Sequence, residues 1–437
     1  MGIRLSDHFT YKKLLRFVLP SIAMMVFISV YGVVDGFFVS NFAGKTSFAA
    51  INLVMPFVML LGGIGFMVGT GGTALVSKVL GEGDREKANR YFSMMVFLTL
   101  LLGVLLTAVG IAAMEPVARF LGATDAMIAD SVLYGRIVVG FTTAFMLQNV
   151  FQSFLIAAEK PKLGLLATIA AGLTNILLDA LFVGGFGWGV AGASAATAIS
   201  KVVSWCILMT PYFRKKTLLT IRFRQFRPRW SDAKEVCAMG SASFFRNGLG
   251  TLAGILLNRI AVGYGTSALA AINVANRITM FMTSACLGFG QGFQPVAGFS
   301  WGAKRFDRVR ESFRFSMIAC VAGISAVALI VGIFARPILL LFTEDDAELV
   351  RIGVFSLRIQ CLAMPFHGFG IIVNMLCSGI GRALPSLLLG LARQGICFFP
   401  ILPLMVRLWG VWGIASVQGA ADMLVMLLAV PIAVRVS

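Results

Sequence analysis

The sequence has few charged side chains and few candidates for catalysis. Only 13% of its 437 residues are charged, and it holds two histidines, His8 and His367. A soluble protein of this size could not cover its surface with so few charges. None of the seven cysteines forms a CxxC pair, so metal and redox sites have little support. Because no nucleophile and base stand in a recognisable arrangement, we expect neither an enzyme nor a cofactor.

Acidic residues are scarcer than basic ones. The chain holds 19 Asp and Glu against 37 Lys and Arg, which gives a net charge of +18. The basic residues lie in short loops between apolar segments, and no nucleic-acid motif surrounds them, so nucleic-acid binding is not expected. An excess of Lys and Arg is typical of the cytoplasmic loops of membrane proteins.

Apolar residues, by contrast, are abundant and occur in long stretches. Hydrophobic residues make up 58% of the chain, and the mean hydropathy is +0.90. Crossing a bilayer takes about 20 residues, and helices satisfy the backbone hydrogen bonds in lipid. The first stretch is too long for a signal peptide and lacks a cleavage site. We predict twelve helical spans, near residues 15–39, 50–77, 92–114, 131–157, 163–185, 189–212, 236–260, 266–297, 313–335, 349–377, 384–406 and 410–434.

The distribution of Lys and Arg predicts the orientation of these spans. The two termini and the loops after even-numbered spans hold 25 Lys and Arg, counting the adjoining span ends, and the opposite loops hold 6. We therefore expect a multi-pass protein of the plasma (inner) membrane with both termini in the cytoplasm.

The chain also repeats itself at an offset of 221 residues. The segment 44–52 (GKTSFAAIN) returns at 265–273 (GTSALAAIN), and 188–192 (WGVAG) returns at 409–413 (WGVWG). One spacing that holds across a whole half indicates a duplicated unit.

Each half has six spans, so each half enters and leaves the membrane on the same side. The halves are therefore expected to be parallel repeats, related by a pseudo-two-fold axis along the membrane normal. We predict an N-terminal lobe over 1–213, a basic cytoplasmic linker over 214–234 and a C-terminal lobe over 235–437, with a cavity between the lobes. A lipid- or partner-binding role of the linker is the less favoured alternative.

Three glycine motifs suggest chemistry that their context does not support. The segment 44–46 (GKT) resembles the end of a phosphate-binding loop, but the leading glycine and a preceding strand are missing. The segment 187–192 matches the spelling GxGxxG in a short turn between spans, again without a strand. Gly65 and Gly69 favour close packing of helices, and a bendable helix is the alternative.

Polar residues at membrane depth in the first half are candidates for an ion site, because burying them in lipid is costly. Asp35 and Asp179 lie roughly 6–9 Å below the outer face, and Asn175 is one helical turn from Asp179. Thr197 lies roughly 12 Å deep in the next span. Carboxylate, amide and hydroxyl oxygens can hold a proton or coordinate Na⁺, so these four residues are the predicted cation site. Alternatively, the carboxylates satisfy hydrogen bonds or neutralise nearby basic residues.

The polar residues in the spans of the second half have a different character from those of the first. Its spans contain Arg246, Arg277, Arg358 and Arg393, and its one deep carboxylate is Asp422. Arg393 and Asp422 both lie near the midplane, so we favour a structural ion pair between them. Arg246 has no obvious partner. It is a candidate to line the cavity and meet an anionic substrate group, with snorkelling or an unrecognised partner as the alternative.

Further polar residues of the second half complete the candidates for the substrate cavity. The predicted cavity residues are Arg246, Asn258, Gln291 and Asn374. His367 is expected to be a hydrogen-bonded packing residue rather than a proton carrier.

Several short motifs occur in order along the chain. The first half contains Pro20, Asp35, residues 175–179 (NILLD) and residues 189–193 (GVAGA) leading to Thr197. The second half contains residues 288–295 (GFGQGFQP), 302–304 (GAK) and 380–385 (IGRALP). In this order and at this spacing, the chain resembles multidrug and toxic compound extrusion (MATE) transporters of the bacterial MepA-like branch over essentially its whole length.

The resemblance implies an all-α integral membrane protein whose two six-helix lobes surround a cavity that opens alternately to each side. It also implies export of small organic, drug-like compounds in exchange for H⁺ or Na⁺. Asp35, Asn175, Asp179 and Thr197 match the cation-site positions of the family. The chain departs from the family at Arg246, in a region where some relatives have a carboxylate. This departure weakens the case for a cation site in the second lobe and for a preference for cationic drugs.

A mechanism follows from this resemblance. We expect ion binding at Asp35 and Asp179 to bend or shift the first span, which Pro20 makes deformable, and so to narrow the cavity and release substrate outward. The main alternative is a flippase of lipid-linked or glycan substrates from the same superfamily, whose phosphate the arginines would bind. A channel is a third class, against which the duplicated lobes argue. We expect a monomer in the lipid bilayer.

Overall fold

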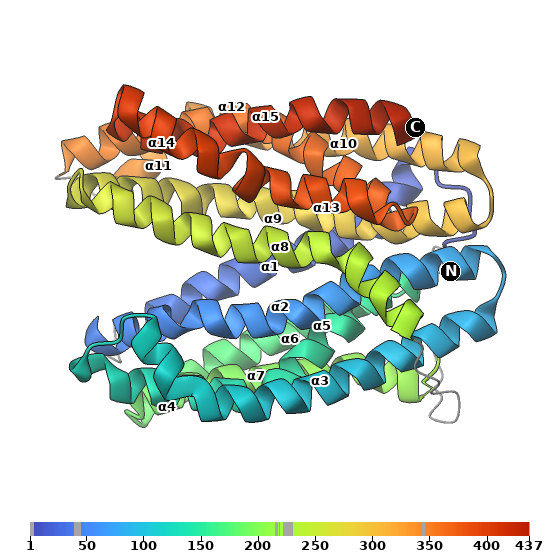
Figure 1. Cartoon of the computed structure of the whole chain (residues 1–437), viewed down its shortest axis with the longest axis horizontal. Coiled ribbons are helices and arrows are strands. Elements are labelled where there is room, and N and C mark those ends of the chain that lie inside the picture. The colour runs from blue at the N-terminus through green and yellow to red at the C-terminus, as the bar shows by residue number, and fades with distance from the viewer. Residues whose placement is uncertain are drawn as a thin grey trace.

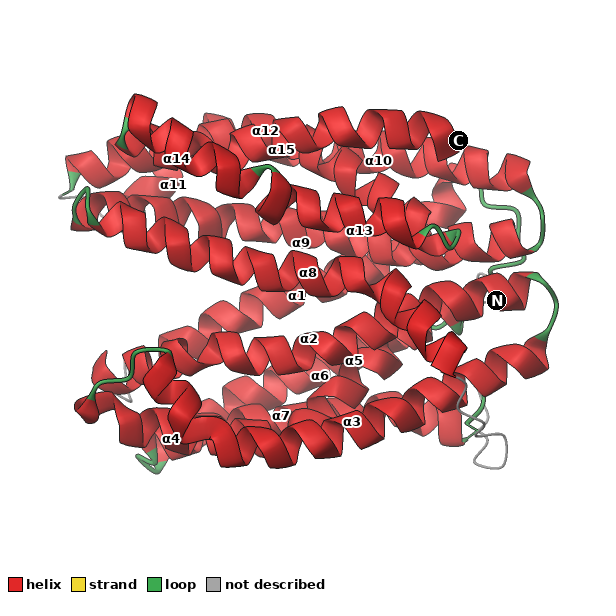
Figure 2. Ribbon diagram, viewed as in Figure 1, coloured by secondary structure: helices red, strands yellow, loops and turns green. Residues whose placement is uncertain are grey.

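The computed structural model describes residues 4–38, 45–214, 217, 219–221, 230–342 and 346–436. Within these residues the chain forms helices and no strands (Figure 2). The all-α fold predicted from the long apolar stretches is therefore confirmed.

The helices of the two halves form two groups that lie one above the other in Figure 1. The first group consists of α1 (Tyr11–Phe38), α2 (Lys45–Gly81), α3 (Arg85–Phe120), α4 (Asp125–Gly140), α5 (Thr142–Ala157), α6 (Pro161–Asp179), η2 (Ala180–Gly185) and α7 (Gly189–Phe213). The second group consists of α8 (Trp230–Val262), α9 (Thr266–Gly302), α10 (Phe306–Ile333), α11 (Ala335–Leu340), α12 (Ala347–Gly379), α13 (Ala383–Leu391), η4 (Ala392–Ile396), α14 (Phe398–Trp409) and α15 (Val411–Val436).

These helices account for the twelve predicted spans. Among the described residues, nine helices are long and apolar enough to cross a membrane, and the pair α4 and α5, bent by 50°, makes a tenth span. α8 and α9 take the places of the predicted spans 236–260 and 266–297, and they are 33 and 37 residues long. Polar residues such as Arg246 and Arg277 make these two helices less apolar than the rest.

The two groups meet where α2 crosses α9. A Cβ added at Gly81 would overlap the carbonyl oxygen of Phe299, and one added at Gly302 would overlap the carbonyl oxygen of Lys78. Gly81 and Gly302 are equivalent positions of the repeat, and so are Lys78 and Phe299. The contact is therefore symmetric between the two copies, and glycine at its centre lets the two backbones approach closely.

Glycines also line the neighbouring contacts between the groups. On α9, a Cβ at Gly288 would lie 2.5 Å from the carbonyl oxygen of Ser21 in α1. On α2, a Cβ at Gly71 would lie 2.7 Å from the backbone nitrogen of Gly240 in α8. Away from these contacts and from the two chain termini, the two groups of helices diverge (Figure 1).

Close packing also explains the glycines of α2 that face its own group. A Cβ at Gly65 would lie 2.5 Å from the Cα of Met146, and one at Gly69 would lie 3.0 Å from the carbonyl oxygen of Asn149, both in α5. The predicted packing role of Gly65 and Gly69 is confirmed.

The segment 4–10 connects both groups at the end where they meet. The backbone N–H of Leu5 donates to Glu159 Oε1 (2.6 Å), between α5 and α6. Arg308 of α10 donates to the carbonyl oxygens of Leu5 (3.2 Å) and Ser6 (3.3 Å). Burial raises the pKa of Glu159 above its ordinary value, and the hydrogen bond from Leu5 acts in the opposite direction. The N-terminal segment thus adds polar contacts to the helix crossings.

Replacing Gly81 by alanine is expected to destabilise this end of the molecule. The added methyl group overlaps the backbone of α9, and overpacking of this kind costs about 1–3 kcal/mol. We expect a lower melting temperature for Gly81→Ala and for Gly302→Ala, measured by intrinsic fluorescence of the purified protein. Gly323→Ala in α10 is the control, because nothing lies within 4 Å of its added Cβ. Equal melting temperatures for all three variants would contradict the packing role.

Candidate functional site

Two of the predicted cation-site residues lie together near the end of α6. Asn175 and Asp179 are one turn apart, and their side chains are 2% and 0% exposed. Nδ2 of Asn175 has no acceptor among the described residues. The side chain of Asp35 in α1 lies outside the described residues, so its distance from Asp179 stays a prediction.

Thr197 lies on α7, in the lining of a small cavity within the first group of helices. Tyr134, Phe145 and Lys201 also line this cavity, and neither Asn175 nor Asp179 is among its lining residues. Nζ of Lys201 donates to Tyr31 Oη (3.0 Å) and lies 4.8 Å from the centroid of the Phe145 ring. Thr197 is therefore on the same face as a lysine, and its participation in one site with Asp179 stays a prediction.

A π-helical turn adjoins a charged residue in the corresponding span of each half. α6 ends at Asp179 and continues as η2, and α13 continues as η4, which contains Arg393. A π turn disturbs the regular helix ladder, and such turns are frequent at functional sites. Both halves thus combine an irregular helix with a charge at membrane depth.

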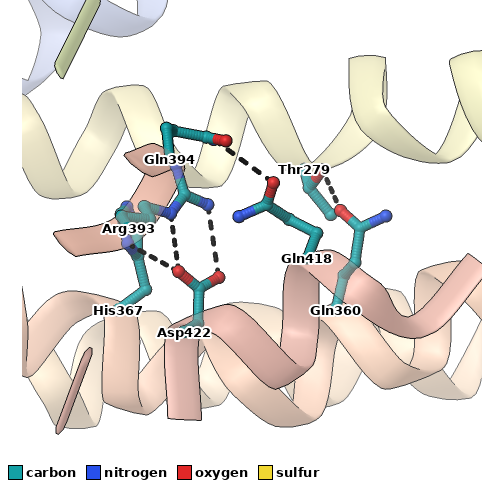
Figure 3. Close-up of polar contacts among 7 residues, drawn as sticks. All are labelled: Thr279, Gln360, His367, Arg393, Gln394, Gln418 and Asp422. Atoms are coloured by element: carbon teal, nitrogen blue, oxygen red, sulfur yellow. Dashed lines mark hydrogen bonds and ion pairs between the residues drawn. The ribbon is translucent and has the colours of Figure 1, made fainter. Parts of the chain in front are cut away.

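The predicted ion pair of the second half is confirmed (Figure 3). Arg393 donates through Nε to Asp422 Oδ1 (2.6 Å) and through a second nitrogen to Oδ2 (3.2 Å). His367 Nδ1 lies 3.4 Å from the same Oδ1. Asp422 is 1% exposed, and this two-point geometry is what a buried carboxylate needs to remain charged. His367 is buried and lies beside the pair, which agrees with a packing role; that it does not carry a proton stays a prediction.

Polar side chains continue along the same region of the second half (Figure 3). Gln394 donates through Nε2 to Gln418 Oε1 (3.2 Å). The remaining amide atoms, Oε1 of Gln394 and Nε2 of Gln418, are buried and have no partner among the described residues. Thr279 donates to Gln360 Oε1 (2.7 Å) further along. Gln394 and Gln418 therefore have unused hydrogen-bonding capacity beside the ion pair.

Arg246 lies on α8 close to the contact with the first group. Ser243, one turn earlier, lies 3.2 Å from the hydroxyl of Thr70 in α2, and Ala242 packs against Gly390 of α13. Arg246 lies about one turn further along the helix from both, between α2 and α13. Its Nη2 is 3.5 Å from the Ser243 hydroxyl, and its buried Nε has no acceptor among the described residues.

The other three predicted cavity residues differ in their exposure and in their hydrogen bonds. Asn258 is exposed and accepts from Asn273 Nδ2 (3.1 Å). Gln291 is 5% exposed, and its Nε2 has no partner within the described segments. Asn374 donates to the carbonyl oxygen of Ser386 (2.6 Å) and so joins α12 to α13. Their role in binding substrate stays a prediction, and the hydrogen bond of Asn374 is structural.

Gln394 and Gln418 are the polar residues that the sequence analysis missed. Gln394 follows Arg393 directly, and Gln418 precedes Asp422 by one helical turn. The i,i+4 spacing, which places Gln418 and Asp422 on one face of α15, was the available signal.

Comparison with known proteins agrees with this architecture. The MatE family model matches the chain twice, over residues 20–181 and 242–404. The multidrug export protein MepA of Staphylococcus saprophyticus is 24% identical over 404 residues, which cover 92% of this chain and 89% of that protein.

Solved structures show the same fold. A crystal structure of MATE in complex with MaL6 has a TM-score of 0.93 at 24% identity, covering 98% of this chain and 97% of that one. A multidrug resistance MATE family transporter of the MOP superfamily, in an outward-facing conformation, has a TM-score of 0.92 at 24% identity, covering 98% and 96%. Because the family model spans one long segment in each half and together more than half of the chain, this protein belongs to the MatE family.

Proposed function

We propose that this protein is a multidrug efflux transporter of the bacterial plasma membrane. The observation that carries the proposal is the match of the MatE family model to both halves of the chain. The name of the Staphylococcus relative, a multidrug export protein aligned over 92% of the chain, supports it. The same relative disfavours a flippase of lipid-linked substrates.

Transport is proposed to be antiport with H⁺ or Na⁺ by alternating access. Asp179 and Asn175, buried at the junction of α6 and η2, are the proposed ion ligands together with Asp35 and Thr197. Protonation or Na⁺ binding there would displace α1, in which Pro20 interrupts the hydrogen-bond ladder.

The termini are proposed to face the cytoplasm, as the Lys and Arg distribution favours. The helix groups meet at the end where the termini lie and diverge at the other end (Figure 1). With this orientation the protein would be closed to the cytoplasm and open outward. We also propose that the first lobe ends at residue 213, that the second begins at residue 235, and that the protein is a monomer.

The test is dye transport by the full-length protein in proteoliposomes. Rhodamine 6G is expected to move against its concentration gradient when a proton or a sodium gradient is imposed, and to stop when nigericin or monensin collapses that gradient. Each gradient is applied alone, which identifies the coupling ion. Dye movement that is the same with and without either ion gradient would exclude antiport.

A further inference from the structure

Within the membrane-spanning segments of the second half, basic side chains outnumber acidic ones. Arg393 and Asp422 form a two-point ion pair, so neither is available to another ion. His367 contacts the same carboxylate. Of the other arginines in these spans, Arg277 and Arg358 are exposed, and Arg246 remains as a partly buried cation for which the described residues supply no carboxylate. This leaves a surplus positive charge within α8.

The guanidinium of Arg246 is also poorly satisfied by hydrogen bonds. Its contact with a protein acceptor is a 3.5 Å approach of Nη2 to the Ser243 hydroxyl, at the outer limit of a hydrogen bond. Its Nε is buried without an acceptor in the described part of the chain. An unpaired charge at membrane depth costs several kcal/mol, so an anionic ligand at this position would recover free energy.

Arg246 is placed where a ligand between the two groups of helices would reach it. The contacts of α8 with α2 involve Gly240 against Gly71, then Ser243 against Thr70, and Phe244, which would lie 3.6 Å from a Cβ at Gly63. Arg246 follows within one turn of Ser243 and Phe244 on α8, next to the residues that contact α2. A group held there would touch both halves of the protein.

Amide groups that could complete such a site lie on the neighbouring elements. Gln394 follows Arg393 in η4 and lies 4.0 Å from a Cβ added at Gly250, which is one turn after Arg246 on α8. Gln418 of α15 bonds to Gln394 and has a buried Nε2 that remains free to donate within the described residues (Figure 3). A guanidinium with a nearby amide donor is the chemistry that binds carboxylate, sulfonate or phosphate groups.

We propose that Arg246 is the anchor of an anion-binding subsite and that the exported compounds include small organic anions. The inference rests on the proposed efflux function and names a substrate class for it. The bound group is a carboxylate, sulfonate or phosphate of the substrate. An inorganic anion such as chloride has the same chemistry, and the experiment separates the two.

The experiment compares two xanthene dyes of opposite charge on the full-length protein. Fluorescein is anionic and rhodamine 6G is cationic, while their ring systems are alike. Binding is measured by fluorescence anisotropy in detergent, and transport by ion-driven movement in proteoliposomes. Fluorescein is expected to bind and to be transported. Arg246→Gln is expected to weaken fluorescein binding by at least about tenfold, because a charge-assisted hydrogen bond is lost. Binding of the cationic rhodamine 6G is not expected to weaken, because the substitution removes a like charge.

The matched control is Arg358→Gln, an arginine of the same lobe whose Nε donates to the carbonyl oxygen of Gly332. It removes the same charge and is expected to leave binding of both dyes unchanged. Arg246→Lys is expected to keep part of the fluorescein affinity, which separates loss of charge from loss of structure. Melting temperatures of all variants check that they are folded.

The outcomes distinguish the subsite from the proposed function. If the unmodified protein transports rhodamine 6G and does not bind fluorescein, the subsite is rejected and efflux stands. If neither dye moves under an ion gradient, the efflux function itself fails. Fluorescein binding that is equal in Arg246→Gln and the unmodified protein also overturns the subsite. Titrating chloride into a buffer free of carboxylate, sulfonate and phosphate tests the inorganic arm: chloride that displaces fluorescein competes for Arg246, and fluorescein transport that persists in chloride identifies the organic anion as the transported species.

Discussion

Asp179→Asn is expected to reduce ion-driven efflux to the level of protein-free vesicles. The substitution keeps the size of a side chain that is 0% exposed and removes its ability to carry a negative charge. Asparagine cannot take up a proton, and it is a weaker ligand for Na⁺ than a carboxylate. If the bound ion drives the change between states, a protein without this carboxylate still binds dye but no longer couples dye movement to the ion gradient.

The measurement is rhodamine 6G movement in proteoliposomes under a proton or sodium gradient, with dye binding recorded in parallel. Asp125→Asn is the matched control, because Asp125 belongs to the same lobe and its side chain is fully exposed in the first turn of α4. It is expected to transport like the unmodified protein. Asp35→Asn is expected to behave like Asp179→Asn. Undiminished coupled transport in both variants would remove the cation site from this lobe.

The number and positions of the spans were predictable because long apolar stretches leave few alternatives in a bilayer. The bends and π turns inside these spans were not predictable. The bend between α4 and α5 follows Gly140, and the π turns η2 and η4 contain glycines, but glycine alone does not predict them, because α3 continues without a break through Gly103 and Gly110. Such local distortions depend on packing against neighbouring helices, which span prediction does not describe.

The site residues show what helix depth does and does not predict. Arg393 and Asp422 lie at similar depths along adjacent spans, which predicted that they are close together. In the structure two hydrogen bonds connect them. Depth also grouped Thr197 with Asp179, and this grouping stays a prediction; Thr197 lines a cavity together with Lys201, one turn away on α7. The position of a residue along its span predicts how deep it lies in the membrane. The direction in which its side chain points depends on the rotation of the helix about its own axis, which is set by contacts between spans.

The two copies of the repeat differ in the positions and signs of their charged residues. Lys201 of the first half is equivalent to Asp422 of the second, although the glycines at the start of the span, Gly189 and Gly192, are kept as Gly410 and Gly413. Lys201 bonds to the hydroxyl of Tyr31, while Asp422 bonds to Arg393. The repeated glycines preserve the helix crossings, and the unequal charges give each half its own chemistry.

Asp422→Leu is expected to destabilise the protein by about 3–5 kcal/mol, because it leaves Arg393 buried without a counterion. Arg393→Met is expected to be similarly costly, since Asp422 would keep only His367 beside it. The combined variant removes both charges and restores an apolar contact between η4 and α15. We expect it to recover most of the lost stability, as replacements of buried ion pairs by apolar residues often do. Thermal unfolding of the four proteins gives the coupling energy of the pair.

This double-mutant cycle also separates a structural pair from a transport site. Because the pair is neutral as a whole, removing both members leaves the surplus charge of Arg246 in place. The combined variant is therefore expected to fold, to transport rhodamine 6G and to retain its affinity for fluorescein. A combined variant that melts like the unmodified protein but transports neither dye would show instead that Arg393 and Asp422 take part in transport. In that case the ion pair would have to open during the transport cycle. The second half would then contribute to ion coupling as well as to the choice of substrate.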